Sequence, residues 1–213
     1  MLPKGGFMKK FVITLARQYG CGGRTVSKMV ADKLGIKYYD KELINIAAEQ
    51  NGVDGEFYKN FDEKAGTKFA SMFSMSSANS YFIPIYNDIQ INDKLFYTQA
   101  DIIKEVAKEP CIIVGRCADY ILRDEENVIN VFLHANIECR KKRLVEKYGV
   151  KDKNISKTIA KADKQRASYY NTYTDLTWGD VKNYNLTINT SHLTLEQVAD
   201  VIVEYVRKYL SND

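Results

Sequence analysis

The sequence has no long hydrophobic run, and this absence limits what kind of protein it can be. No apolar stretch reaches the ~20 residues that a membrane-spanning helix needs. The first residues also lack the apolar segment of a secretory signal. We therefore expect an intracellular, cytoplasmic protein with no membrane partner.

Soft metal ligands are scarce as well. The chain has four cysteines and two histidines, and no two cysteines form a C-x-x-C pair. A structural zinc site is not expected, and the scattered thiols fit a reducing compartment. Cys111 lies in an apolar run and is predicted to be a core residue. Cys21 lies in a glycine-rich turn, where we expect an exposed and oxidisable thiol.

Neither sign of charge dominates the chain. The 31 basic and 27 acidic side chains leave a formal net charge of +4. This mild excess suits an anionic small-molecule substrate and is too small to indicate nucleic acid. At 213 residues the chain is long enough to form one domain with a substantial core.

Short apolar runs are spread along the chain, and helical patterns separate them. The runs are rich in β-branched and aromatic residues, as buried parallel strands are, and they cover residues 11–15, 36–39, 111–114, 128–133 and 184–188. Strands that alternate with helices predict an α/β fold, with a parallel sheet covered on both faces. Its ligands should gather at the carboxyl ends of the strands.

Caps and apolar stripes indicate three helices. The first is predicted to run to Leu34, with Gly35 as its stop. Thr194 and Gln197 have the spacing of a capping box, which predicts the start of the last helix. A third apolar stripe covers residues 91–106 and includes one polar member, Gln99, either a satisfied core amide or a group that reads a ligand.

A glycine-rich turn follows the first predicted strand and is the most informative stretch of the chain. Residues 18–25 read QYGCGGRT, close to the phosphate-loop pattern G-x-x-x-x-G-K-[ST]. Glycines there let successive amides and the helix N-terminus point at a polyphosphate. The predicted nucleotide-binding residues of the turn are Gly20, Cys21, Gly22, Gly23, Arg24 and Thr25.

Two positions depart from the phosphate-loop pattern: Gln18 replaces the first glycine, and Arg24 replaces the lysine. Arginine is a planar fork, so Arg24 would grip the outer phosphates bidentately and not act as a point charge. Thr25 offers the hydroxyl that commonly holds Mg²⁺ in such loops. The alternative is a strand-to-helix turn with no ligand.

Periodicity fails between residues 65 and 86. Serines are mixed there with methionines and aromatic residues, which is too apolar for a solvated linker. We interpret residues 65–90 as a flexible segment that covers a substrate or a neighbouring subunit, so a homodimer through this segment is one expectation. The alternative is a loop packed on its own core.

The chain resembles the cytidylate kinase-like family, a branch of the nucleoside monophosphate kinases. The resemblance covers nearly the whole chain and rests on residues 16–24, 38–40, 113–116, 163–166 and 186–191. It implies a five-stranded parallel sheet, a mid-chain acceptor-binding insertion and a cationic helical lid. The whole chain, 1–213, would form a single domain. Its divisions would be the phosphate loop and first βαβ unit at 8–64, the covering segment at 65–90, the central helix and strands at 91–134, the lid at 135–175, and the last strand and C-terminal helix at 176–213.

The resemblance also implies roles for residues that face the acceptor. Asp40 is either an N-cap or an acceptor contact. Arg116 follows a predicted strand, where a guanidinium can clamp a phosphate. True cytidylate kinases carry Gly-Arg-Asp at this point, whereas this chain has Cys117 after Arg116. Asp119 either substitutes for the missing carboxylate or is a solvated helix residue.

The cationic lid is predicted from a second group of residues. Arg140, Arg143 and Arg166 are the expected catalytic cations that close over the transferring group. Such cationic runs are more often solvated faces. Asp163 is expected near the acceptor, with a surface pair to Arg166 as the alternative. Arg17 precedes the turn and is expected to contact phosphate.

Together these features predict an enzyme that transfers the γ-phosphoryl group of ATP, with Mg²⁺, to a nucleoside monophosphate. Cytidylate is the leading acceptor by resemblance alone. One alternative is a nucleotide-binding regulatory protein that has lost turnover, which the replacements Arg24 and Cys117 suggest. Another is a kinase of the same fold that acts on a non-nucleotide acceptor.

Overall fold

A computed structural model describes residues 10–40 and 85–211 of the chain. Parallel strands form one sheet in the order β2-β3-β1-β4-β5. The strands are β1 (Val12–Arg17), β2 (Lys37–Tyr39), β3 (Cys111–Val114), β4 (Val128–His134) and β5 (Leu186–Asn189). The predicted five-stranded parallel α/β fold is therefore confirmed.

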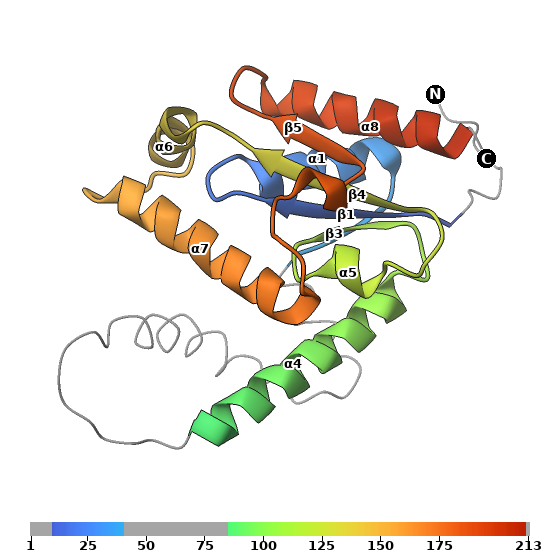
Figure 1. The fold of residues 1–213 in the computed structure, drawn as a ribbon. Coiled ribbons are helices and arrows are strands. Elements are labelled where there is room, and N and C mark those ends of the chain that lie inside the picture. The colour runs from blue at the N-terminus through green and yellow to red at the C-terminus, as the bar shows by residue number, and fades with distance from the viewer. Residues whose placement is uncertain (1–9, 41–84, 212–213) are drawn as a thin grey trace.

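Helices cover both faces of this sheet (Figure 1). The elements are α1 (Gly23–Leu34), α4 (Ile85–Val106), α5 (Ala118–Ile121), α6 (Ile137–Glu146), α7 (Ile155–Thr174), the 3-10 turn η1 (Val181–Asn183) and α8 (Leu195–Ser211). Helices α1 and α8 lie on one face, and α4, α5 and α7 lie on the other. Within the two described stretches, no helix is long and apolar enough to cross a bilayer.

The central strand β1 shows why the core has two halves. Its side chains alternate between the faces of the sheet. Ile13 and Leu15 pack with α1 and α8, whereas Val12 packs with α4 and α5. All three side chains are buried, as expected for a strand covered on both faces. Cys111 of β3 is buried beside Val12, which confirms its predicted place in the core.

The predicted helix ends are largely confirmed. Gly35 ends α1 with a φ of 67°. The capping box is formed, because Thr194 N donates to Gln197 Oε1 at 2.9 Å and Gln197 N donates to Thr194 Oγ1 at 3.1 Å. The start of α4 was predicted at Ile91 and lies at Ile85. The covering segment is therefore shorter than predicted, and its residues 65–84 lie outside the described residues.

Two helices lie beside the carboxyl edge of the sheet. The chain enters α6 directly after β4 and continues into α7, and both helices stand next to the turn that joins β1 to α1 (Figure 1). These are the helices of the predicted lid region. The carboxyl ends of β1 and β3 meet at the same edge, because β1 and β3 are paired in parallel.

Candidate functional site

The turn between β1 and α1 depends on two glycines in the left-handed region. The φ angles of Gly20 and Gly22 are 81° and 91°. Gly22 is also the residue before the first turn of α1, and a Cβ at that position would lie 2.5 Å from Leu195 Cδ2. Other residues would be strained in this backbone and would clash with α8. The glycine spacing of the sequence is therefore a requirement of the turn.

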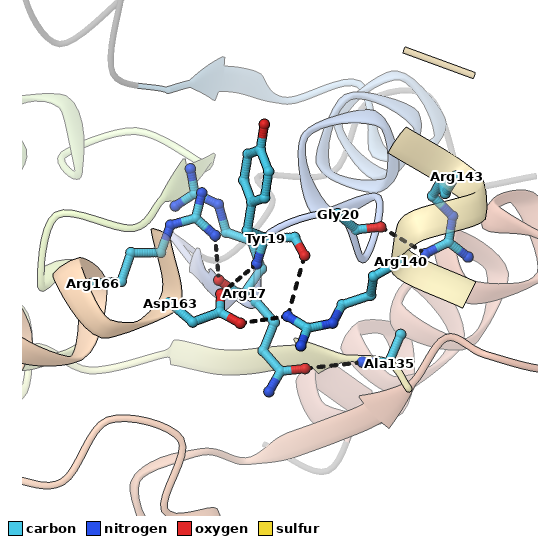
Figure 2. Close-up of polar contacts among 9 residues, drawn as sticks. Arg17, Tyr19, Gly20, Ala135, Arg140, Arg143, Asp163 and Arg166 are labelled. Carbon is cyan, nitrogen blue, oxygen red and sulfur yellow. Dashed lines mark hydrogen bonds and ion pairs between the residues drawn. The ribbon is translucent and has the colours of Figure 1, made fainter. Parts of the chain in front are cut away.

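Two arginines of α6 hold the turn from outside. Arg140 Nη1 donates to Tyr19 O at 3.2 Å, and Arg143 Nη1 donates to Gly20 O at 3.2 Å (Figure 2). Both arginines were predicted as catalytic cations. The structure places their guanidiniums on the carbonyls of the turn, and their role in the reaction stays a prediction.

Thr190, just after β5, continues this outer layer. Thr190 Oγ1 donates to Cys21 O at 3.0 Å. The same threonine accepts from Arg143, which also donates from Nη2 to Thr190 O at 3.1 Å. Three successive carbonyls of the turn are thus bound by side chains outside it.

The outward carbonyls decide where the amides point. In a planar trans peptide the N–H is directed opposite to the C=O of the preceding residue. Because Tyr19 O and Cys21 O face α6 and β5, the amides of Gly20 and Gly22 face the inside of the turn. Within the described stretches neither amide has a hydrogen-bond acceptor. Together with the first amides of α1, they form a row of donors suited to an oxyanion.

Asp163 of α7 fastens the turn to the lid helices. Tyr19 N donates to Asp163 Oδ1 at 2.7 Å, and Arg140 forms an ion pair with the other carboxylate oxygen (Figure 2). Arg166 also lies near the Asp163 carboxylate, but the ion pair that the structure shows for Asp163 is the one with Arg140. The reason is that α6 passes close to α7 and offers Arg140 at a partly buried position, where an ion pair is less screened than at the surface.

Gln18, the residue that replaces the first glycine of the motif, has a structural role. Its side-chain Oε1 accepts from Ala135 N at 3.2 Å, and its backbone N donates to Leu133 O at 2.9 Å. Gln18 therefore joins the start of the turn to the end of β4. A glycine there would lose the side-chain bond.

A group of arginines lies near the turn, at the carboxyl edge of the sheet. Arg166 of α7 donates from Nη1 to Arg17 O at 3.0 Å (Figure 2). Burial, and then the nearby charges of Arg166, Arg116 and Arg24, lower the pKa of Arg17 to about 10. Among the residues described, no acidic side chain forms an ion pair with Arg17. We call Arg17, Arg24, Arg116 and Arg166 the arginine cluster.

Arg116 enters this cluster from a backbone of unusual shape. Gly115, Arg116 and Cys117 have φ angles of 76°, 62° and 56° in succession. For residues other than glycine this region costs roughly 1–2 kcal/mol each. Such strain persists where the surrounding structure enforces it, and it is common at functional sites. The Arg116 side chain lies near Arg17 and near Tyr169 of α7.

Arg24 and Asp40 meet at the end of β2. Arg24 Nε lies 3.4 Å from Asp40 Oδ2, and Tyr38 Oη donates to the same oxygen at 2.9 Å. The Asp40 side chain is largely buried, whereas that of Arg24 is 61% exposed. Whether Asp40 caps a helix lies outside the described residues.

Thr25 in the first turn of α1 is the predicted metal ligand. Its hydroxyl is 2.9 Å from the hydroxyl of Tyr148, in the turn after α6. In residues 10–40 and 85–211 no group of three acidic, histidine or cysteine side chains is arranged to hold a metal. The donor set fits Mg²⁺ held by nucleotide phosphates and water with help from one hydroxyl, since Mg²⁺ often keeps much of its water shell.

The structure does not bring every predicted residue to the arginine cluster. Asp119 is buried, and its Oδ2 accepts from Tyr170 Oη at 2.7 Å. Its side chain thus belongs to the core between α5 and α7. Cys21 was predicted to be exposed and oxidisable, and this is wrong: its side chain is fully buried, and burial raises the pKa of the thiol. The close packing of the turn against α1 and β4 leaves it no path to solvent.

A parallel sheet of this order, with a glycine turn that presents amides at the start of α1, defines the phosphate-loop kinase fold. The chain belongs to the cytidylate kinase-like family, whose model matches residues 12–192. Family and fold are those of kinases of nucleotides and small molecules.

Individual relatives agree with this assignment. Cytidylate kinase of Methanosarcina barkeri is 23% identical over 192 residues, which cover 89% of this chain and 93% of that protein. The crystal structure of an uncharacterized protein from Eubacterium ventriosum has a TM-score of 0.69 and 26% identity, with 92% and 98% of the two chains covered. Shikimate kinase from Bacteroides thetaiotaomicron shares the fold, with a TM-score of 0.51, 17% identity and 94% and 98% coverage.

Sequence reasoning missed the roles of three residues that shape the site. Tyr148 lies against Thr25, Thr190 holds a carbonyl of the turn, and Gln18 fastens the turn to β4. Thr190 gave a weak signal, because it lies two residues after the carboxyl end of the last predicted strand. No local pattern marks Tyr148, since its partner is 123 residues away.

Proposed function

We propose that this protein is an ATP-dependent phosphotransferase that moves the γ-phosphoryl group to a nucleoside monophosphate, with a cytidylate-like acceptor first among candidates. One observation carries the proposal: the turn that presents the amides of Gly20 and Gly22 continues into Gly23, against which Arg17 packs, and no acidic side chain among the described residues forms an ion pair with Arg17. Amides and guanidiniums that converge in this way suit a polyphosphate.

The donor and the acceptor would occupy neighbouring parts of this edge. The turn and the first amides of α1 would hold the phosphates of ATP, and Thr25 would contribute a hydroxyl to Mg²⁺. Arg116 and Asp40, at the ends of β3 and β2, would place the acceptor. Mg²⁺ supplies charge neutralisation when bound. No general base is required, because phosphoryl transfer depends chiefly on positioning and on electrostatic stabilisation.

Arg140, Arg143 and Asp163 would act through the turn. Their contacts with Tyr19 and Gly20 fix the outward carbonyls, and through them the direction of the amides. We propose that this preorganises the donor site, so that little reorganisation is needed when ATP binds.

A kinase of a non-nucleotide acceptor is the second candidate. It is favoured by the position of Asp119, whose carboxylate is bonded to Tyr170 in the core, and by Cys117 at the place of the aspartate in true cytidylate kinases. Without a carboxylate at that position, the proposed acceptor site has one acidic group fewer that could form a hydrogen bond with a nucleobase. A regulatory protein without turnover is the third.

A coupled ADP-release assay with ATP and Mg²⁺ separates these candidates. The acceptors are CMP, dCMP, UMP, AMP, GMP, shikimate and gluconate, each compared with the rate without acceptor. Stimulation by one nucleotide supports the proposal, and stimulation by a sugar or a carboxylic acid alone supports the second candidate. ATP binding with no stimulation by any acceptor supports the regulatory protein.

Arg116→Ala tests the placement of the acceptor. We expect the KM of the acceptor to rise about 10–100-fold, the range expected for a lost charged hydrogen bond, while the affinity for ATP changes little. Arg123→Ala is the matched control, because Arg123 is exposed and stacks on Tyr120 of its own segment. Equal losses for ATP and acceptor would contradict the assignment of Arg116.

A further inference from the structure

The cation at the lysine position of the phosphate-loop pattern is directed away from the turn. Arg24 pairs with Asp40 at the end of β2, on the side proposed for the acceptor. Its side chain is more than half exposed. A lysine at this position normally reaches the outer phosphates of the donor. In the structure Arg24 does not take that position.

Arg17 lies where such a charge is needed. Its side chain passes between two glycines that belong to different elements. A Cβ at Gly23, the first residue of α1, would lie 2.7 Å from Arg17 Cγ, and a Cβ at Gly115, just after β3, would lie 2.3 Å from Arg17 Nη1. Both distances are shorter than atoms in contact allow, so Gly23 leaves room for the stem of Arg17, and Gly115 leaves room for its guanidinium in the position observed. Arg17 therefore spans from the turn to the edge that carries Arg116.

The surroundings of Arg17 favour an anion. Three other members of the arginine cluster, Arg166, Arg116 and Arg24, are near enough to lower its pKa, and burial lowers it further. Like charges crowd together at a cost, which a bound anion with several negative oxygens would offset. Arg166 also donates to the carbonyl of Arg17, which fixes the backbone beneath the guanidinium.

We propose that Arg17, at the end of β1, takes the part of the missing lysine and stabilises the phosphoryl group in transit, while Arg24 serves the acceptor side. This rests on the proposed function. The bond from the γ-phosphorus to the bridging oxygen breaks, and its electron pair leaves with ADP. The bond from an acceptor phosphate oxygen to the γ-phosphorus forms. Arg17 exchanges no proton and neutralises charge on the equatorial oxygens.

Three variants assayed with the best acceptor test this exchange of roles: Arg17→Ala, Arg17→Met and Arg24→Ala. For Arg17→Ala we expect kcat to fall ~10³-fold, as for other arginines that stabilise a transferring phosphoryl group, with the KM of ATP within about threefold of wild type. For Arg24→Ala we expect the KM of the acceptor to rise about tenfold, and kcat to fall less than for Arg17→Ala.

Chemical rescue distinguishes a cation from a structural side chain. Millimolar guanidinium should restore kcat of Arg17→Ala about tenfold or more, whereas urea, which has the same shape without the charge, should not. Wild type with both additives is the control. Equal effects of guanidinium and urea, or a larger kcat loss for Arg24→Ala than for Arg17→Ala, would overturn the inference.

Two further outcomes keep the result unambiguous. If Arg17→Ala does not fold by circular dichroism, Arg17→Met decides, because methionine keeps much of the side-chain length without the charge: a kcat reduced ~10³-fold at unchanged ATP affinity supports the inference, and a wild-type kcat overturns it. If wild type phosphorylates no acceptor, the proposed function fails and takes this inference with it. An active wild type with an equally active Arg17→Ala refutes the inference alone.

Discussion

At the scale of single residues, Asp119 shows how burial sets the behaviour of a charge. Its carboxylate lies in the core cluster that contains Ile121 and Tyr170, away from the arginine cluster. Burial raises the pKa of Asp119, and hydrogen bonds from Tyr170 Oη and from backbone amides oppose that rise. The folded protein therefore holds the proton of Asp119 more tightly than the unfolded chain does.

The sign of this shift gives a pH-dependent prediction. An acid whose pKa is raised in the folded state destabilises the fold when it is charged in both the folded and the unfolded state. The free energy of unfolding therefore rises as the pH falls through the folded pKa, because the folded protein then takes up the proton. Asp119→Asn keeps an acceptor for Tyr170 and does not titrate. We expect this variant to have the higher Tm at pH 8 and to lose that advantage toward pH 3.5, measured by thermal unfolding. A constant difference across this range would contradict the burial argument.

At the scale of elements, α6 and α8 begin with comparable caps but have different tasks. Asn136 Oδ1 accepts from Cys139 N at 2.8 Å at the start of α6, and Thr194 caps α8. Only α6 carries the arginines that hold the turn. The two caps therefore form a matched pair in which stability and site geometry can be separated.

Removing either cap should cost the protein about 1 kcal/mol of unfolding free energy, or about 2–4 °C in Tm at this length. We expect Asn136→Ala to weaken ADP binding as well, by about 2–5-fold, because a frayed α6 holds Arg140 and Arg143 less firmly. Thr194→Ala should leave ADP affinity unchanged. Thermal unfolding and calorimetric titration measure both effects, and equal ADP affinities of the two variants would argue against a role for α6 at the turn.

Tyr148, in the turn after α6, is hydrogen-bonded to Thr25, whose hydroxyl is proposed to contact Mg²⁺. When Tyr148 donates, its proton occupies a lone pair of the threonine oxygen that the ion would use. Tyr148→Phe removes this competitor. We expect Mg²⁺·ADP to bind about 2–5-fold more tightly to the variant, the range of one exposed hydrogen bond, and metal-free ADP to bind as before. A gain without Mg²⁺ would mean that Tyr148 obstructs the nucleotide itself.

At the scale of the whole molecule, the site joins parts of the chain that are far apart in sequence. Strand β1 supplies Arg17, the turn after β3 supplies Arg116, and α7 supplies Arg166. The folded state thus concentrates positive charge that the unfolded chain keeps apart. A polyvalent anion that binds only the folded state will stabilise it.

Pyrophosphate should therefore raise the Tm of the whole protein. At a concentration 100 times its Kd the gain is about 2.7 kcal/mol, or roughly 5–11 °C. Potassium chloride at equal ionic strength is the control, since screening alone would act through both salts. We expect Arg166→Met to lose most of the shift. The same shift with chloride would show that no specific anion site exists.

The sequence determined those features that depend on near neighbours along the chain. Strand periodicity, the glycines of the turn and the caps at Gly35 and Thr194 were all visible, because backbone conformation and alternate burial are set over a few residues. These features sufficed for the parallel sheet and for the position of the phosphate loop.

Only the tertiary structure decided what the charged side chains do. Asp163 is 144 residues from Tyr19, and Arg166 is 149 residues from Arg17, yet each pair is hydrogen-bonded. Arginine and aspartate side chains take the partners that the packing of helices brings within reach, and sequence spacing does not encode those partners. The order of the strands and the passage of α6 and α7 across the sheet edge set these contacts.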